Sequence, residues 1–167
     1  DTRDQAKTFI YAFIFGAGPA KMGKIVGKGK QAGQQMIHNY LEAVPALRIL
    51  RKKIDKASAS GLIKAIDGRL LNIRSKHSAL NTLLQGMGAI VCKYWLIEIM
   101  KRIHKHKFNA KLVGSIHDEY QFEVSTDDAS EFAIHTNEAI KDVEINLELR
   151  CPLDSDYKIG KNWKETH

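Results

Sequence analysis

Apolar residues recur at three- and four-residue spacing over most of the chain, which is the periodicity of amphipathic helices. This pattern predicts helices over residues 1–15, 45–57, 78–106 and 127–143. Between the first two, residues 20–40 alternate lysine with glycine and glutamine, which indicates short exposed helices that glycine interrupts. Gly16, Gly18 and Pro19 end the first helix. Ser75 or Ser78 is placed to cap the longest one.

Shorter runs have the character of strands. Residues 63–73 enclose the dipeptide Asp67-Gly68, which strongly favours a β-hairpin. Residues 112–115 and 120–124 predict two strands that flank the tripeptide His117-Asp118-Glu119, and the alternation over 145–151 predicts a last strand. Helices come first, followed by hairpin, long helix and strands. We therefore expect an α+β fold with a small antiparallel sheet.

Composition adds information about partners. The 167 residues include 26 lysines and arginines against 19 acidic residues, a formal charge of +7 that favours polyanions such as nucleic acid. A basic protein without such a partner stays an open alternative. Cys92 lies in an apolar helical pattern and Cys151 is distant in sequence, so we expect reduced thiols. Neither an uninterrupted 18-residue apolar run nor a signal peptide is evident, so we expect a cytoplasmic protein without a membrane partner.

A basic and aromatic stripe on the first helix is the first candidate site. Arg3, Lys7, Tyr11 and Phe15 are each four residues apart and so share one helix face. The two cations are suited to phosphate oxygens, and the two aromatic rings to a sugar and a base. The alternative is a solvated basic helix end with two core aromatics, and the spacing alone does not decide between them.

The second candidate site is His117-Asp118-Glu119, at the apex between two apolar strands. Carboxylates on such a rigid turn suit Mg²⁺, which prefers hard oxygen ligands. An ordinary polar turn is the plain alternative. A metal-dependent phosphohydrolase of the His-Asp type is a rival interpretation, but it requires further His and Asp ligands on helices, and the sequence offers none at convincing spacing.

A third polar stripe follows the long helix, at His77, Asn81, Gln85 and Gly88. Buried amides are costly unless they are paired, so this stripe either faces a ligand such as the minor groove of a duplex or satisfies carbonyl groups of the fold. The sequence leaves both options open.

Taken together, these residues resemble the family A DNA polymerases, and in particular the replicative polymerases of podovirus-type phages. Arg3, Lys7 and Tyr11, continued by Phe15-Gly16-Ala17-Gly18, resemble motif B of the fingers, and His117-Asp118-Glu119 resembles motif C of the palm. The segments that resemble the approach to the palm helix and the carboxyl end of the phage enzymes are Asp67-Gly68-Arg69, the run from Arg74 to Gln85, and Gly160-x-Asn162-Trp163-x-x-x-His167.

The resemblance implies a division into helical fingers (residues 1–62) and a partial palm (63–167), and template-directed transfer of dNTPs to a DNA primer. Arg3 and Lys7 would bind the dNTP phosphates, with Lys7 assisting the leaving pyrophosphate. Tyr11 would lie by the sugar and Phe15 near the template base. Asp118 and Glu119 would serve the Mg²⁺ site. The residues implied to contact primer-template DNA are Arg74, His77, Asn81, Gln85 and His117.

Two departures from the family pattern matter. Phe15 stands where the family usually has tyrosine. The family's motif A aspartate, which lies upstream of the fingers helix, is absent, although two-metal catalysis needs carboxylates that bridge both ions. We therefore expect the carboxyl-terminal part of a polymerase, inactive alone and completed by an upstream part on the same or a separate chain. The alternative is a noncatalytic nucleic-acid-binding module derived from a polymerase.

Overall fold

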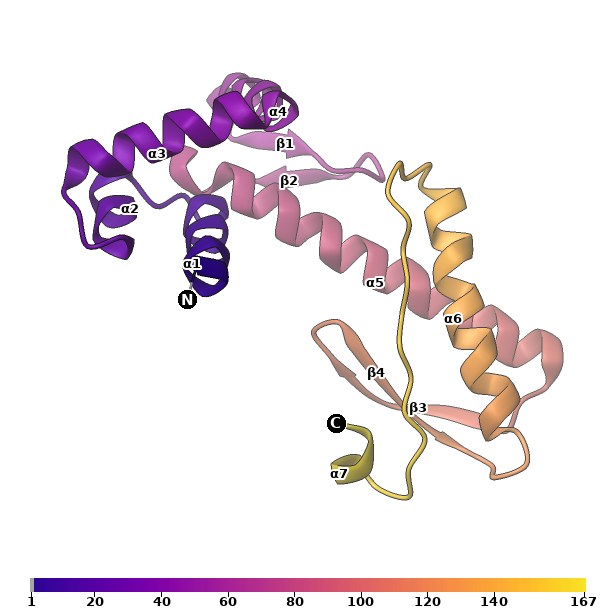
Figure 1. Cartoon of the computed structure of the whole chain (residues 1–167). Helices are drawn as coiled ribbons and strands as arrows, with labels where there is room; N and C mark the ends of the chain where they lie inside the picture. The colour runs from indigo at the N-terminus through magenta and orange to yellow at the C-terminus, as the bar shows by residue number, and fades with distance from the viewer. Residues whose placement is uncertain (1) are drawn as a thin grey trace. The chain divides into compact units, whose positions relative to one another are not determined.

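The computed structural model describes residues 2–167, and these form a mostly helical fold with two small antiparallel sheets (Figure 1). The chain divides into two compact units, one ending at Gly86 and the other running from Met87 to His167, and each is described by itself. This boundary lies inside the longest helix. It separates compact packing units and does not test the expected division into fingers and palm at residue 62.

The first unit is built from four helices and a β-hairpin. They are α1 (Thr2–Ile14), α2 (Pro19–Ile25), α3 (Lys30–Ala43), α4 (Pro45–Ala57), β1 (Leu62–Lys64) and β2 (Leu70–Asn72). Short 3₁₀ turns follow α4 at Ser58–Ser60 and β2 at Lys76–Ser78. The predicted helix over 45–57 and the hairpin around Asp67-Gly68 are therefore confirmed. Ser75 caps the second 3₁₀ turn by accepting a hydrogen bond from the Ser78 amide.

Aromatic packing forms the core of this unit next to α1. Phe9 and Phe13 are 8% and 4% exposed, and both meet the ring of Tyr40 on α3 edge to face, with centroids 5.3 and 5.2 Å away. Helices α2 and α3 approach closely because Gly33 has no side chain. A Cβ there would lie 2.0 Å from the Pro19 carbonyl oxygen. The pattern predicted short helices interrupted by glycine in this basic segment. The structure instead has the two helices α2 and α3, which the glycine allows to pack against each other.

The second unit contains most of the long helix α5 (Ala79–His106), the hairpin of β3 (Ala110–Ile116) and β4 (Glu119–Val124), α6 (Ala129–Asn146) and the short α7 (Trp163–Thr166). Its core joins α5, the loop after it and α6 through Ile99, Ile103, Phe108, Phe132 and Ala139. Two hydrogen bonds fix the packing on α5. The Trp95 indole donates to the Thr136 carbonyl, and the Tyr120 hydroxyl donates to the Cys92 carbonyl, each at 2.8 Å.

The predicted strand over 145–151 is wrong. Ile145 and Asn146 continue α6, and the chain then turns, with Glu148 at φ +51°. The Leu149 amide bonds the Glu144 carbonyl and the Glu148 amide bonds the Ile145 carbonyl. This is the bonding of a Schellman-type helix end, which usually has glycine at the left-handed position. The alternation of apolar residues predicted a strand, and the segment contains no glycine that would have indicated the turn.

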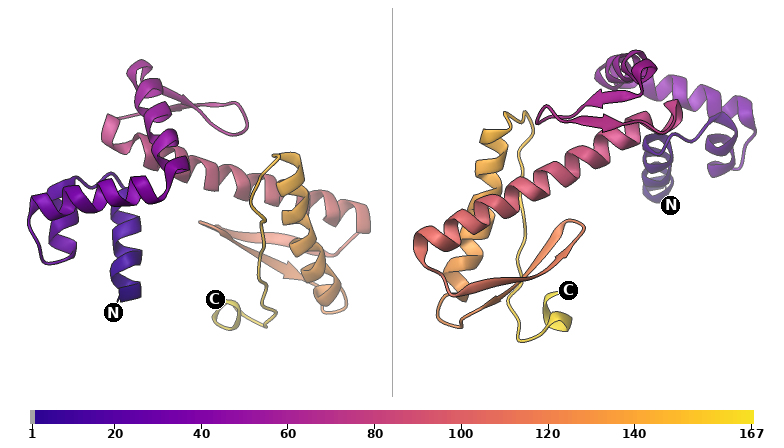
Figure 2. Two further views of the ribbon diagram at one scale, coloured as in Figure 1. Left: turned by 45° about the horizontal axis from the view of Figure 1, so that its top comes forward. Right: turned by 180° about the vertical axis from the view of Figure 1, so that it is seen from behind.

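After α6 an extended segment returns along that helix and leads to α7 beside the hairpin (Figures 1 and 2). Ser155 donates to the Asn137 side chain, and the Leu153 amide donates to Glu144. Thr166 then donates to the Gln121 side chain at 3.1 Å. The last residues of the chain are thereby placed next to β4.

Residues 76–106 are long and apolar enough to cross a membrane by length and composition alone. Core helices of other proteins meet the same criteria. In this unit Ile90, Ile99 and Ile103 are buried, and Glu98 on the same helix is buried in an ion pair with Lys101. Only 17% of the most apolar window of this helix is buried, so length and composition alone do not assign its role, and the absence of a membrane partner stays a prediction. Cys92 and Cys151 are both free thiols, the first half-buried and the second exposed.

Candidate active site

Three residues of the predicted nucleotide-binding stripe lie on the solvent side of α1, and the fourth, Phe15, directly follows the helix. Arg3 and Lys7 are exposed, and Tyr11 and Phe15 are 53% and 58% exposed. The ammonium of Lys7 lies 6.0 Å from the centre of the Tyr11 ring. The aromatic residues of the core are instead Phe9 and Phe13, on the opposite face. The alternative of two core aromatics at positions 11 and 15 therefore does not hold.

The end of α1 is held against the 3₁₀ turn that precedes α5. Gly16 has φ +77°, and a Cβ on it would lie 2.1 Å from the His77 carbonyl oxygen. Only glycine accommodates both the left-handed backbone and this contact. Phe15 and His77, two of the predicted site residues, are thus positioned by one backbone contact. A small cavity of about 190 Å³ lies beside them, lined by Phe13, Gly16, His77 and Leu80 among others.

The predicted DNA-binding residues before and on α5 differ in burial. Arg74, His77 and Gln85 are exposed, whereas Asn81 is half-buried. Among the described residues, the Asn81 Oδ1 atom is buried without a hydrogen-bond partner. Such a group costs free energy unless a ligand or water satisfies it. This oxygen can only accept, so it does not bear on the alternative in which the amide nitrogens of the stripe donate to carbonyl groups of the fold.

His117 and Asp118 form a two-residue turn between Ile116 and Glu119, which pair across the hairpin. His117 has φ +53°, a left-handed conformation that costs a non-glycine residue about 1–3 kcal/mol and that two-residue hairpin turns commonly require. Both His117 and Asp118 are exposed. Burial raises the pKa of the Cys92 thiol on α5, and the negative charge of Asp118 nearby raises it further.

Glu119 is engaged by neighbours that were not predicted. Its Oε1 accepts from the Gln121 amide, and its Oε2 lies 3.2 Å from Nδ1 of His167. The Gln121 hydrogen bond, followed by His167 and the charge of Lys158, holds the pKa of Glu119 below its usual 4.5. These partners lie beside a cavity of about 450 Å³ that Trp95, Phe132 and Tyr157 also line. His167 is 48 residues from Glu119, so spacing gave no signal of this contact.

The carboxylates of Asp118 and Glu119 differ in their ability to coordinate a metal ion. Asp118 is an exposed oxygen donor on a rigid turn, which suits Mg²⁺. Both oxygens of Glu119 already have partners, so it fits a supporting role at most. Among the described residues, these two carboxylates belong to no group of three acidic, histidine or cysteine side chains whose ligand atoms all lie within 4.8 Å of one another. The nucleotide-binding stripe and this turn belong to different units, so each is described alone.

Comparison with known proteins agrees with the motifs. The model of "DNA polymerase family A" matches residues 1–165. The DNA-directed DNA polymerase of Escherichia phage Phieco32 is 42% identical, and that of Escherichia phage T7 is 37% identical. In each case 99% of this chain is covered, but only 28% and 27% of the phage proteins. The chain thus spans little more than a quarter of the relatives that it matches.

A solved structure supports the same fold. The chain resembles the POL domain of Pol1 from M. smegmatis, solved in complex with DNA primer-template and dNTP, with a TM-score of 0.75 at 18% identity. The match covers 84% of this chain and 27% of that one. The mostly helical α+β architecture with small antiparallel sheets is therefore that of a polymerase domain. From the family match over nearly all of its length, this chain belongs to DNA polymerase family A.

Proposed function

We propose that this chain forms the fingers and part of the palm of a template-directed DNA polymerase, which transfers dNTPs to a DNA primer. The observation that carries the proposal is the exposed face of α1, where two cations precede two aromatic rings in the order of motif B. Arg3 and Lys7 bind the triphosphate, Tyr11 lies against the sugar, and Phe15 stacks near the template base. Lys7 also assists departure of the pyrophosphate.

Asp118, with Glu119 in support, would hold the Mg²⁺ that family A polymerases use. The ion supplies charge stabilisation for phosphoryl transfer. The protein's own contribution is positional: the two-residue turn fixes Asp118 at the apex, and Gln121 and His167 keep the Glu119 carboxylate ionised and oriented. A second bridging carboxylate is supplied by the remainder of the polymerase. The 167 residues alone are accordingly inactive in primer extension.

The residues that contact primer-template DNA are Arg74, His77, Asn81, Gln85 and His117. The unsatisfied Oδ1 of Asn81 supports this proposal, because a donor on a base or a water at the groove would complete it. The similar M. smegmatis domain, solved in complex with primer-template DNA and dNTP, supports the choice of ligands.

A segment exchange tests the proposal. Residues 1–167 replace the matching segment of the phage Phieco32 polymerase, to which they are 42% identical. We expect the chimera to extend a primer on a template, while the 167-residue chain alone does not. The matched control is a chimera with Arg3→Ala and Lys7→Ala, which folds but loses incorporation. A folded chimera that binds DNA yet never extends a primer favours the noncatalytic binding module and contradicts the proposal.

A further inference from the structure

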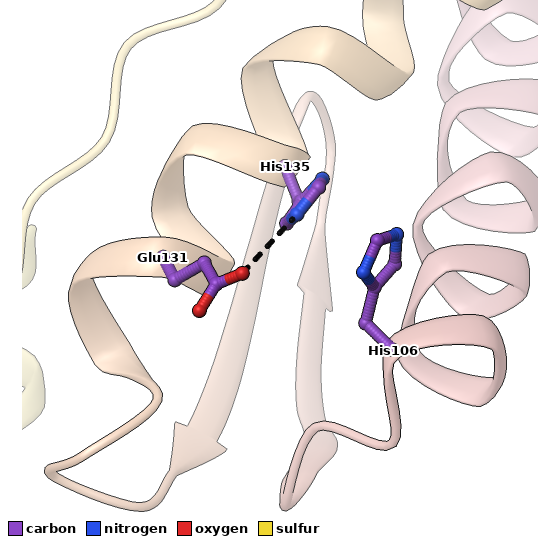
Figure 3. A group of neighbouring side chains, drawn as sticks. All are labelled: His106, Glu131 and His135. Carbon is purple, nitrogen blue, oxygen red and sulfur yellow. Dashed lines mark ion pairs between the residues drawn. The ribbon is translucent and has the colours of Figure 1, made fainter.

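A second group of possible metal ligands lies away from the polymerase motifs. His106 is the last residue of α5, and Glu131 and His135 are one turn apart near the start of α6 (Figure 3). Their ligand atoms all lie within 4.8 Å of one another. All three residues belong to the second unit and sit on helices that share its core. The backbones that carry these ligands are therefore held firmly in place.

This group is separate from the Asp118 turn. His106 precedes β3 and Glu131 follows β4, whereas the turn is at the other end of that hairpin. Strands of this length span about 20 Å, at roughly 3.3 Å per residue. The two groups therefore lie at opposite ends of the hairpin and cannot share an ion. The His117-Asp118 pair gains no further ligand from these helices, which leaves the phosphohydrolase interpretation without support.

The surroundings of His135 direct one ring nitrogen toward a ligand. Its Nδ1 lies 3.0 Å from Glu138 Oε2, while Nε2 faces Glu131 Oε1 at 3.8 Å. A carboxylate behind the far nitrogen of a histidine is the usual support of a metal ligand, because it fixes the tautomer that leaves Nε2 unprotonated. The side chain of His135 is 16% exposed, so its orientation is restricted.

Arg102 holds the Glu138 carboxylate in place, and it also competes with that carboxylate for Nδ1 of His135. Its guanidinium donates to Glu138 and to Asp142, each at 2.7 Å. It also lies 3.1 Å from Nδ1 of His135. When Nδ1 accepts from Arg102, the proton sits on Nε2 and blocks a metal. When Nδ1 donates to Glu138, Nε2 is available, so metal binding and this second tautomer favour each other.

His106 completes the group from the side. Its ring centre lies 4.2 Å from that of His135, and it stacks on the buried ring of Phe108 at 5.6 Å. Glu131 and Glu138 both contact His135, and Glu138 and Asp142 pair with the nearby Arg102, so carboxylates predominate around this imidazole. Both His106 and Glu131 are exposed at their tips and can turn inward.

We propose that His106, Glu131 and His135 bind a divalent ion of the Zn²⁺ class. Two imidazoles and one carboxylate, with a water in the fourth position, are a common ligand set for Zn²⁺ and a poor one for Mg²⁺. Bond lengths near 2.0–2.2 Å require the ligand atoms to draw together by about 1–1.5 Å, which rotation of the exposed side chains supplies. The ion would join the end of α5 to the start of α6 and stabilise the second unit by linkage.

Calorimetric titration of the metal-free 167-residue chain with ZnCl₂, in excess MgCl₂, tests this site. We expect one Zn²⁺ per chain and a rise in the midpoint of thermal unfolding. His106→Gln should abolish both effects, and Glu138→Gln should weaken binding by about tenfold or more by disturbing the support of His135. His104→Gln is the matched control, since this exposed histidine of the same helix lies outside the group and its loss should change nothing. Co²⁺ should give the absorption of a tetrahedral site in the parent chain and not in His106→Gln.

Three results would overturn the proposal. One is no binding of Zn²⁺ by the parent chain. Another is undiminished binding of Zn²⁺ by His106→Gln. The third is binding that disappears in Cys151→Ser or Asp118→Ala and persists without His106, which would place the ion at the exposed thiol or at the hairpin turn.

Discussion

At the scale of single residues, the chemistry depends on which side chains are presented to solvent and which are paired. Tyr11 is exposed beside Lys7, while Phe9 and Phe13 fill the core. The apolar periodicity of the sequence favours a buried face that contains Phe9 and Phe13, but the spacing of the stripe did not decide whether Tyr11 and Phe15 also belong to the core. Packing against Tyr40, distant in sequence, decides it.

Tyr11→Phe, introduced into the active chimera, should raise discrimination against dideoxynucleotides. A phenol hydroxyl beside the sugar can take the place of the missing 3′-hydroxyl, and a phenyl ring cannot. Leaving that polar contact unmade costs about 1–3 kcal/mol, or roughly one to two decades in the ratio of kcat/KM values. Tyr40→Phe is the control, since Tyr40 packs in the core. An unchanged ratio in Tyr11→Phe would show that Tyr11 is not beside the sugar.

Gln121→Ala should return the pKa of Glu119 toward 4.5, because the Gln121 hydrogen bond is the largest cause of its depression. A lowered pKa in the folded state stabilises the fold above the unfolded-state value, and this contribution disappears as pH falls through the folded-state value. The stability gap between parent and variant should therefore narrow below about pH 4.5. NMR titration of the Glu119 carboxyl and urea unfolding at several pH values measure this. Gln34→Ala, an exposed amide on α3, should leave the Glu119 titration curve unchanged.

At the scale of elements, local signals predicted most helices and turns well. Pro45 begins α4 and Asp67-Gly68 turns the first hairpin, as expected. The prediction of a strand over 145–151 was wrong because this segment forms a helix end with Glu148 in the left-handed region. Backbone hydrogen bonds stabilise that helix end, and no residue type in the sequence indicates them. The contacts of Glu119 with His167, and of His106 with His135, join segments 48 and 29 residues apart, and no local pattern contains them.

Two glycine substitutions separate a required glycine from a dispensable one. Gly16→Ala should destabilise the 167-residue chain by more than about 1 kcal/mol, because it combines a left-handed backbone with a clash against the His77 carbonyl. Gly88→Ala, within α5, meets nothing within 4 Å and should stabilise by up to about 1 kcal/mol. Urea unfolding of both variants provides the measurement. Equal effects of the two substitutions would contradict the placement of Gly16 against His77.

At the scale of the whole molecule, a net charge of +7 and family membership both favour a polyanionic ligand. Charge alone left a partner-free basic protein open, and the ordered motifs narrowed the choice. The division into two units was not predictable from composition, because its boundary falls within the continuous periodicity of α5.

Binding of primer-template DNA to the 167-residue chain should weaken steeply with salt, since each neutralised phosphate releases counterions and contributes about −0.9 to the logarithmic slope. Arg74→Ala should reduce the magnitude of that slope by about one, whereas Lys52→Ala, an exposed lysine of α4 outside the proposed DNA path, should not. Fluorescence anisotropy between low and physiological ionic strength measures both. A flat salt dependence would contradict a basic DNA-binding surface.

The most direct test of the proposed catalytic role compares Asp118→Ala with Asp127→Ala in the chimera. Asp127 is an exposed aspartate at the other end of the same hairpin region and serves as the matched control. Single-turnover incorporation and the Kd for primer-template DNA are measured for both. Because Asp118 would hold Mg²⁺ where charge develops in the transition state, Asp118→Ala should slow incorporation by at least about a hundredfold while Kd changes by no more than about twofold. Asp127→Ala should alter neither quantity. Equal and mild effects of the two substitutions would contradict the assignment of Asp118 to the catalytic metal site.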